Sequence, residues 1–303
     1  MLWQLKIVET GFRDLKTTIM KKLLVPTDFS TTAERAISFA IELAKQSGGE
    51  IFLLHVYDHI KEQFSSHKEI IKEYNTQQVQ ERSQQLRSAQ ETISKEGIPA
   101  TTLLYSGEVS DTIIWAAKEN GVDCIVMGTL GATGLKTAIF GTKTASVLSE
   151  TSIPVITIPF NYTWKTPHKL LLAINDAEED PKLFQPAFDL TDLFQAQVET
   201  LIFSEERAVA VDVMEHARVL SKVQQRLSQY YSKYPIETIH VTGKDFQQTV
   251  QEFIDMHQVD LLVMITHRRK LLQNLFKFSL TRQMAYHTTI PLLSLHSMRI
   301  NYL

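Results

Sequence analysis

Cysteine is nearly absent from the chain, because Cys124 is the only one among 303 residues. A single thiol excludes both a disulfide framework and a metal site built on several cysteines. Cys124 lies in the aliphatic run VDCIVMG, where a small buried thiol is the usual interpretation and a reactive one is less favoured.

Long apolar runs and an excess of charge of one sign are also missing. No stretch approaches the roughly 18 apolar residues of a membrane-spanning helix. Charged residues are scattered through the first twenty positions, where a signal peptide would have an apolar core. The 31 Lys and Arg residues nearly balance 34 Asp and Glu, which leaves a net charge of −3. We therefore expect a cytoplasmic protein without general attraction for nucleic acid or membranes.

The common signatures of catalytic and metal sites are absent as well. The sequence has no HExxH, no Walker GxxxxGK[ST] motif and no serine or cysteine nucleophile with a recognisable local pattern, and its ten histidines are dispersed. We assign no catalytic residue and no metal ligand.

A regular alternation of aliphatic runs and helical patterns begins at Met20. The aliphatic runs are typical of buried strands, and the segments between them are typical of helices, the first of which opens with the capping-box pattern Thr31 to Glu34. The expected strands are 22–27, 50–56, 101–105, 123–127 and 154–158, and the later helices 66–96, 110–120 and 142–150. Continuous aliphatic strands joined through helices predict a parallel sheet covered on both faces.

The same order of elements then occurs a second time. KLLLAIND at 169–176 parallels KLLVPTD at 22–28, and TIPLLSL at 289–295 parallels SIPVITI at 152–158. Similar landmarks in the same order indicate a tandem duplication. We predict two doubly wound α/β domains of the flavodoxin-like type, each with five parallel strands. Their expected extents are 20–160 and 169–303, with 161–168 as the linker.

Residues 1–19 precede this pattern. MKKLLVPTDFS, from Met20 on, has the form of a natural opening of the first strand. The leading segment is therefore either an upstream extension of the reading frame with a mis-assigned start, or a strand or helix that packs on the first domain. One sequence leaves both interpretations open.

Glycine is scarce, yet four of the 11 glycines fall between 128 and 141, directly after the fourth strand. Ligands of open parallel sheets bind at the carboxyl ends of the strands, where the strand order reverses. A glycine loop that leads into a helix offers backbone N–H groups and the positive end of the helix dipole to a phosphate. Thr142 and Thr144 add hydroxyl donors, and Lys143 or Lys136 adds a charge. The alternative is a turn that only packs the helix on the sheet.

Three motifs resemble the universal stress protein family, in its nucleotide-binding branch. They are VPTDFS after the first strand, LLHV at the end of the second, and GxxGx9G[ST] after the fourth, and the resemblance covers most of residues 20–297. It implies an adenine nucleotide, with ATP favoured, with or without Mg²⁺. In this resemblance Asp28 contacts the ribose, and Val56 with Pro26 and Thr27 borders the adenine. Met127 and Gly128 lie under the sugar. The residues that hold phosphate are Gly131, Gly141, Thr142 and Lys143. For Asp28 the alternative is a simple helix N-cap.

The second repeat departs from this pattern at the glycines. Only Asp176 survives, at the place of Asp28. Side chains now stand where a phosphate needs bare backbone, so we expect one nucleotide, in the first domain. Counting back from the shared Ile-Pro puts Ile265, Arg268, Phe278 and Ser279 at the places of Gly128, Gly131, Gly141 and Thr142. The basic run His267 to Lys270 is either a solvated turn or a site for another anion.

The residues favour binding over catalysis. Phosphoryl transfer needs charge stabilisation and a positioned base, and Asp28 with Thr142 supplies little of either, so any ATP hydrolysis should be slow. We expect a nucleotide-dependent module of stress response or signalling. The alternatives are an ATP-consuming enzyme of the adenylating type, whose SGGxDS loop is here PTDFSTT, and a pairing module without ligand.

The expected assembly also follows from the resemblance. Single domains of the family commonly pair through their fifth strands, because an uncovered edge strand presents unpaired backbone groups. PVITI and PLLSL are short, uncharged and apolar, and we expect them to pair within one chain. Whole chains are candidates for a further homodimer.

Overall fold

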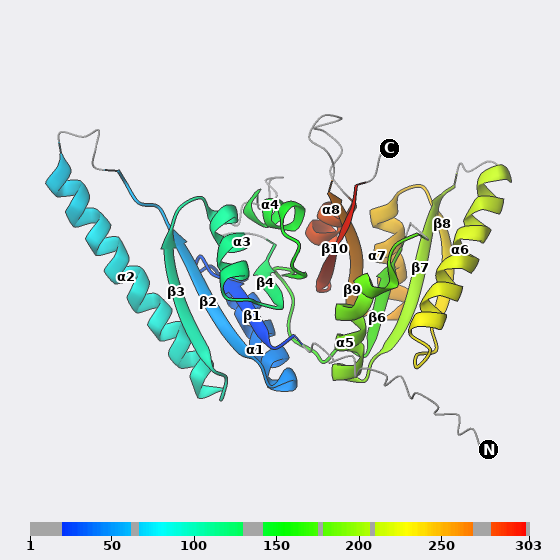
Figure 1. The fold of residues 1–303 in the computed structure, drawn as a ribbon, viewed down its shortest axis with the longest axis horizontal. Coiled ribbons are helices and arrows are strands. Elements are labelled where there is room, and N and C mark those ends of the chain that lie inside the picture. Colours follow the sequence, from blue (N-terminus) through cyan, green and yellow to red (C-terminus); the bar gives the residue numbers. More distant parts are fainter. Residues whose placement is uncertain are drawn as a thin grey trace, which may run out of the picture.

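The computed structural model describes residues 20–61, 67–129, 142–174, 178–206, 210–268 and 280–300. In these residues the chain forms a single twisted sheet with helices on both faces (Figure 1). The strands are β1 (Lys22–Pro26), β2 (Glu50–Tyr57), β3 (Ala100–Ser106), β4 (Cys124–Gly128), β5 (Val155–Ile158), β6 (Lys169–Ala173), β7 (Gln197–Glu205), β8 (Glu237–Gly243), β9 (Leu261–Arg268) and β10 (Leu292–Ile300). Their order across the ten-stranded sheet is β3-β2-β1-β4-β5-β10-β9-β6-β7-β8.

The helices alternate with the strands along the chain. They are α1 (Thr31–Ser47), α2 (Lys68–Lys95), α3 (Val109–Glu119), α4 (Thr142–Glu150), a 3-10 turn η2 (Pro181–Phe184), α5 (Gln185–Phe194), α6 (Ala210–Tyr230), α7 (Phe246–His257) and α8 (Leu280–His287). Among the described residues, no helix is long and apolar enough to cross a membrane.

The start of α1 differs from the sequence prediction by one residue. The capping-box pattern places the cap at Thr31, whereas the N-cap is Ser30, whose hydroxyl accepts a hydrogen bond from the Ala33 N–H at 3.2 Å. Serine is as good a cap as threonine, so the turn that precedes α1 decides which residue takes the cap position. At the other end, Gly48 has a left-handed φ of 63°, which closes the helix.

Strand side chains alternate between two cores, one on each face of the sheet. In β1, Leu23 and Val25 pack in the same core as Phe39 of α1 and Leu86 of α2. Leu24 points to the other face and packs in the core that contains residues of α3 and α4. Burial on both faces explains why the strands are continuous aliphatic runs.

β5 and β10 join the two halves of the sheet. They pair antiparallel, with Ile156 opposite Leu293, whereas the other neighbouring strands pair in parallel. The Thr157 hydroxyl donates to the Leu292 carbonyl at 3.4 Å, and His296 Nε2 donates to the Leu148 carbonyl at 2.6 Å. Each core contains residues from both halves. The predicted α/β class with doubly wound parallel sheets is confirmed, and the two sheets are continuous with each other.

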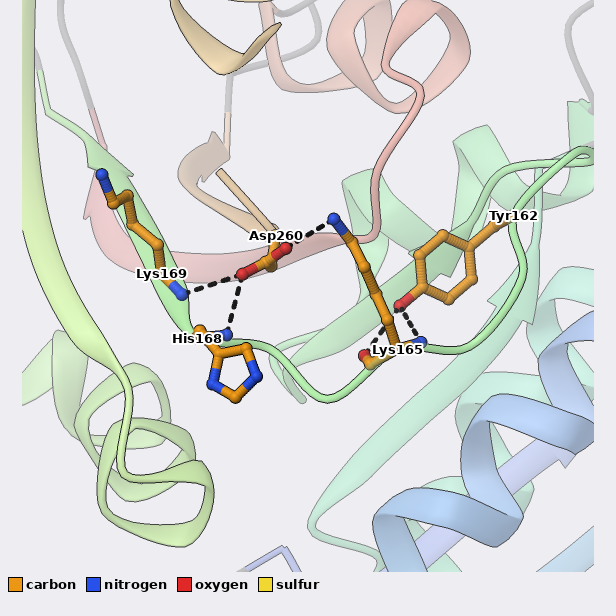
Figure 2. A network of polar contacts seen from close by, with 5 residues as sticks. All are labelled: Tyr162, Lys165, His168, Lys169 and Asp260. Carbon is orange, nitrogen blue, oxygen red and sulfur yellow. Dashed lines mark hydrogen bonds and ion pairs between the residues drawn. The ribbon is translucent and has the colours of Figure 1, made fainter. Parts of the chain in front are cut away.

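The connection between the halves is anchored by Asp260 at the start of β9. Its carboxylate accepts the backbone N–H groups of His168 and Lys169 at 2.8 and 3.0 Å and pairs with Lys165 Nζ at 2.6 Å (Figure 2). Asp123 makes the equivalent contacts in the first repeat, where it accepts the N–H groups of residues 21 and 22 at 2.9 Å. The Val-Asp pair that precedes the fourth strand of each repeat, Val122-Asp123 and Val259-Asp260, is therefore a repeated strand anchor.

Candidate functional site

The candidate site lies at the carboxyl ends of β1, β2 and β4. β1 stands between the other two strands, and the chain leaves β1 toward β2 on one side and reaches β4 on the other. This is the point at which the strand order reverses, where open parallel sheets bind ligands. The structure brings together at this edge the predicted residues of three separate segments: Pro26, Thr27 and Asp28 after β1, Val56 near the end of β2, and Met127 and Gly128 at the end of β4.

A tight turn between β1 and α1 presents Asp28. The Thr27 N–H continues the sheet by donating to the Leu54 carbonyl at 2.8 Å, and its hydroxyl accepts from the Phe29 N–H at 3.0 Å. Asp28 Oδ1 accepts from the Ser30 N–H at 3.0 Å. Asp28 is exposed and lies two residues before the cap. It is therefore a turn-forming carboxylate at the strand end, and the N-cap interpretation is wrong.

Phe29, the next residue, has a left-handed backbone with φ of 61°. Such a conformation in a bulky residue costs on the order of 1–3 kcal/mol and persists only where the surroundings impose it. The Phe29 ring lies 4.7 Å from the His55 ring, centroid to centroid. His55 is buried, and its Nδ1 donates to the Thr27 carbonyl at 2.7 Å. Burial lowers the pKa of His55, although the bond to Thr27 opposes this, so the ring is a neutral support of the turn.

Gly128 allows α1 to approach β4 closely. A Cβ atom built on Gly128 would lie 2.4 Å from Thr32 Cγ2 and 2.9 Å from the Thr32 carbonyl oxygen. Only glycine fits there without a shift of the helix. By strand register, Ile265 of β9 corresponds to Gly128 of β4. In the second repeat the short 3-10 turn η2 takes the place of the first turns of a long helix. Close packing thus explains Gly128 in the first repeat, whatever a ligand requires.

Met127 and Thr144 also have structural roles. Met127 is buried in the core shared with α3 and α4. The Thr144 hydroxyl donates to the Gly128 carbonyl at 3.0 Å, and Thr281 donates to the Ile265 carbonyl at 3.0 Å at the same place in the second repeat. A contact that occurs in both repeats ties the last helix to its strand without a ligand.

Lys143 and Glu108 form a contact that the sequence analysis missed. Lys143, at the start of α4, pairs with Glu108, which caps α3 by accepting the Asp111 N–H at 3.0 Å. Lys143 is the main cause that lowers the pKa of the Glu108 carboxyl. The partners are 35 residues apart in sequence, and no local pattern links them.

Several predicted residues lie outside the part of the chain that the structure describes. These are Gly131, Lys136 and Gly141 of the glycine loop, and Asp176, Phe278, Ser279 and the end of the basic run at Arg269 and Lys270 in the second repeat. Thr142 is described as the first residue of α4. Within the described residues there is no group of three or more His, Cys, Asp and Glu side chains that could hold a metal ion.

The fold and this edge define a tandem, doubly wound α/β protein with a candidate ligand site at the strand-order reversal of its first half. Residues 20–159 and 167–296 both match the universal stress protein family, so the chain belongs to that family. The match covers each half separately, in agreement with the repeat.

Relatives with one such domain resemble part of the chain. Universal stress protein MJ0577 of Methanocaldococcus jannaschii is 29% identical over 152 residues, which is 46% of this chain and 94% of that protein. Universal stress protein YxiE of Bacillus subtilis is 30% identical over 147 residues, 46% of this chain and 99% of that protein. A crystal structure of a universal stress protein from Archaeoglobus fulgidus matches the fold of both halves, with a TM-score of 0.68 over 91% of this chain and 98% of that one at 16% identity.

Proposed function

We propose that the first domain binds one adenine nucleotide, with ATP preferred, and that occupancy controls a role in stress response or signalling. The observation that supports this best is the convergence of Asp28, Val56 and the start of α4 on the strand-order reversal between β1 and β4. Such an edge combines a carboxylate for sugar hydroxyls with a helix N-terminus for phosphate.

Each segment would have its own part in binding. Asp28 would accept hydrogen bonds from the ribose, since the turn holds it exposed at the edge. Pro26, Thr27 and Val56 would border the adenine, and Met127 with Gly128 would form the floor. Gly131, Gly141, Thr142 and Lys143 would hold the phosphates, with Thr144 fixing α4 to β4. Lys143 would have to exchange Glu108 for phosphate oxygens.

Binding is a better match than catalysis to these groups. Among the described residues, His55 is buried and hydrogen-bonded within the fold, and no carboxylate cluster surrounds the site. If Mg²⁺ takes part, it would enter with the nucleotide phosphates. Hydrolysis of ATP would then be slow. A site that positions ATP without a general base, and without charged groups around the transferred phosphoryl group, stabilises the transition state only a little.

The second domain is proposed to lack a nucleotide and to complete the sheet through β10. β5 and β10 already pair with each other, so a homodimer of whole chains would need another surface. The rival function, an adenylating enzyme, predicts rapid conversion of ATP to pyrophosphate and AMP when its acceptor substrate is present. A turnover assay with ATP and Mg²⁺ separates the two functions.

The direct test is mass spectrometry of the small molecules released when the purified protein is denatured, followed by calorimetric titration of Asp28→Ala. Loss of charge-assisted bonds to the ribose should weaken ATP binding about 10- to 100-fold. Asp255→Ala removes an exposed carboxylate from the second domain and is the control. Equal affinities for the two variants would contradict the assignment of the site.

A further inference from the structure

The ion pair of Lys143 with Glu108 joins the starts of α4 and α3 beside the candidate site. Lys143 lies in the first turn of α4, and the next residue, Thr144, donates its hydroxyl to the Gly128 carbonyl at 3.0 Å. The start of α4 is thereby tied to the end of β4. The side chains of Lys143 and Glu108 are each about half exposed. The pair is therefore accessible to a solute at this edge of the sheet.

The turn between β3 and α3 fixes the Glu108 carboxylate in place. One of its oxygens pairs with Lys143, and the other accepts the Asp111 N–H at 3.0 Å. The Glu108 carbonyl accepts the Thr112 hydroxyl at 2.7 Å. Gly107, before it, has a φ of 148°, and a Cβ there would lie 2.9 Å from the Thr112 hydroxyl oxygen. The carboxylate is thus held at the start of the helix by its own turn.

α7 of the second repeat begins with the same cap arrangement but a different residue. Asp245 accepts the Gln248 N–H at 2.9 Å, and the Thr249 hydroxyl donates to the Asp245 carbonyl at 2.7 Å. Aspartate is one of the favoured N-cap residues, whereas glutamate is not among them. Glu108 therefore takes the cap position of the first repeat although capping alone favours other residues.

The cation opposite the cap also belongs to the first repeat. Thr144 and Thr281 make the same contact with the preceding strand, which places Leu280 where the first repeat has Lys143. α7 and α8 pack together as α3 and α4 do, so the packing of these helices does not require a charged pair. The pair of Glu108 and Lys143 occurs in the half that has the glycine loop.

We propose that Glu108 competes with nucleotide phosphates for Lys143, a proposal that rests on the proposed function of the first domain. With no nucleotide bound, the carboxylate takes the place of a phosphate as the partner of Lys143. On binding, Lys143 turns to the phosphates, and Glu108 keeps its bond to the Asp111 N–H. The exchange breaks one exposed ion pair and leaves a carboxylate near the phosphate charges. Both effects oppose binding of the phosphates and spare the base and the sugar, so Glu108 limits the preference for ATP over adenosine.

Glu108→Gln tests the competition, because the amide oxygen can still accept the Asp111 N–H while the charge is removed. Asp111→Asn is the control, since it removes an exposed carboxylate from the same turn of α3 and leaves the ion pair in place. Calorimetric titration of the nucleotide-free chains gives the affinity for ATP with Mg²⁺, and competition with adenosine gives the affinity without phosphates. We expect Glu108→Gln to bind ATP about three- to tenfold more tightly than the natural chain and the control. Adenosine should bind all three equally.

The outcomes separate this proposal from the proposed function. Equal affinities of Glu108→Gln and the natural chain for ATP, or the same gain in Asp111→Asn, would overturn the competition and leave nucleotide binding intact. No ATP binding by chains that circular dichroism shows to be folded would contradict the proposed function, and the competition with it.

Two further variants complete the test. In a Lys143→Met background, Glu108→Gln should change the affinity for ATP by about twofold or less, because the shared partner is gone. A gain as large as in the natural background would overturn competition for Lys143. Glu108→Asp has the cap residue of the second repeat and a shorter reach to Lys143, so it should also bind ATP more tightly, and it replaces Glu108→Gln if that variant does not fold.

Discussion

Gly128 shows how a single residue serves the packing of the first domain. The space that a Cβ would need is occupied by Thr32, with the nearest atom, Cγ2, at 2.4 Å. The contact is between a strand end and the first turn of α1, so it fixes the edge at which Asp28 is presented. Packing and the candidate site therefore depend on the same glycine.

Gly128→Ala should lower the free energy of unfolding by about 1–3 kcal/mol, the usual cost of overpacking a well-filled site. Urea denaturation measures the loss. Thr32→Ser removes the methyl group nearest the new Cβ, so Gly128→Ala in a Thr32→Ser background should cost less than in the natural chain. An alanine variant as stable as the natural chain would show that the two elements have room to separate.

The residue types at the site could be predicted from the sequence, but most of their contacts could not. Asp28 and Val56 end neighbouring strands, and that follows from aliphatic runs and strand order. The role of Gly128 does not follow from the sequence pattern, because the position of α1 brings Thr32 against it. Glu108 and Lys143 meet only because α3 and α4 pack side by side, which no local pattern encodes.

At the scale of elements, the antiparallel contact of β5 with β10 determines the architecture. The strand runs PVITI and PLLSL predict two buried strands, and their pairing places Val155 opposite Ser294. The boundaries predicted for the strands and helices of the first repeat differ from the structure by at most two residues, because helix and strand ends depend on caps and turns that neighbouring elements help to set.

Val155→Cys combined with Ser294→Cys should form a disulfide within one chain. Directly opposed residues of antiparallel strands have Cα atoms about 4.5–5.5 Å apart, which suits a disulfide. Peptide mapping by mass spectrometry under oxidising conditions detects the bond. Val155→Cys with Ser204→Cys is the control, because β7 lies three strands beyond β10 in the sheet. Linked dimers without linked monomers would mean that the strands pair between chains in solution.

At the scale of the whole molecule, the linker is part of the folded structure. Asp260 anchors it to the second half, and Trp164 packs between Phe39 of α1 and Phe194 of α5, with ring centroids 5.0 and 6.0 Å apart. Aromatic packing and the charged anchor drawn in Figure 2 therefore hold both halves to the same connection.

The Asp260 anchor should make the free energy of unfolding depend on pH in the acid range. Burial opposes its ionisation, but Lys165 and the backbone N–H groups of His168 and Lys169 outweigh burial and hold the pKa of Asp260 below its usual 3.8. A carboxyl whose pKa is lower in the folded state than in the unfolded state adds to the free energy of unfolding at pH values above its unfolded pKa. This contribution is lost as the pH falls through its folded pKa.

Asp260→Asn should therefore melt a few degrees lower than the natural chain at neutral pH, by about 2–4 °C per kcal/mol of lost stability. The difference should shrink as the pH falls below 3.8, the usual value of the carboxyl. Thermal melts followed by circular dichroism across the acid range measure it, with Asp255→Asn as an exposed control. A difference that stays constant down to pH values well below this range would contradict the role of the charge.

The proposed function requires that the two halves share a fold but that only the first binds a nucleotide. Ile265 stands where the first half has Gly128, and the sequence places Arg268 and Phe278 where it has Gly131 and Gly141. Side chains at these positions would occupy the space that the sugar and the phosphates need.

Calorimetric titration of the nucleotide-free natural chain with ATP and Mg²⁺ measures the number of sites directly. We expect one nucleotide per chain. Two equivalent sites per chain, or no binding by a chain that circular dichroism shows to be folded, would contradict it.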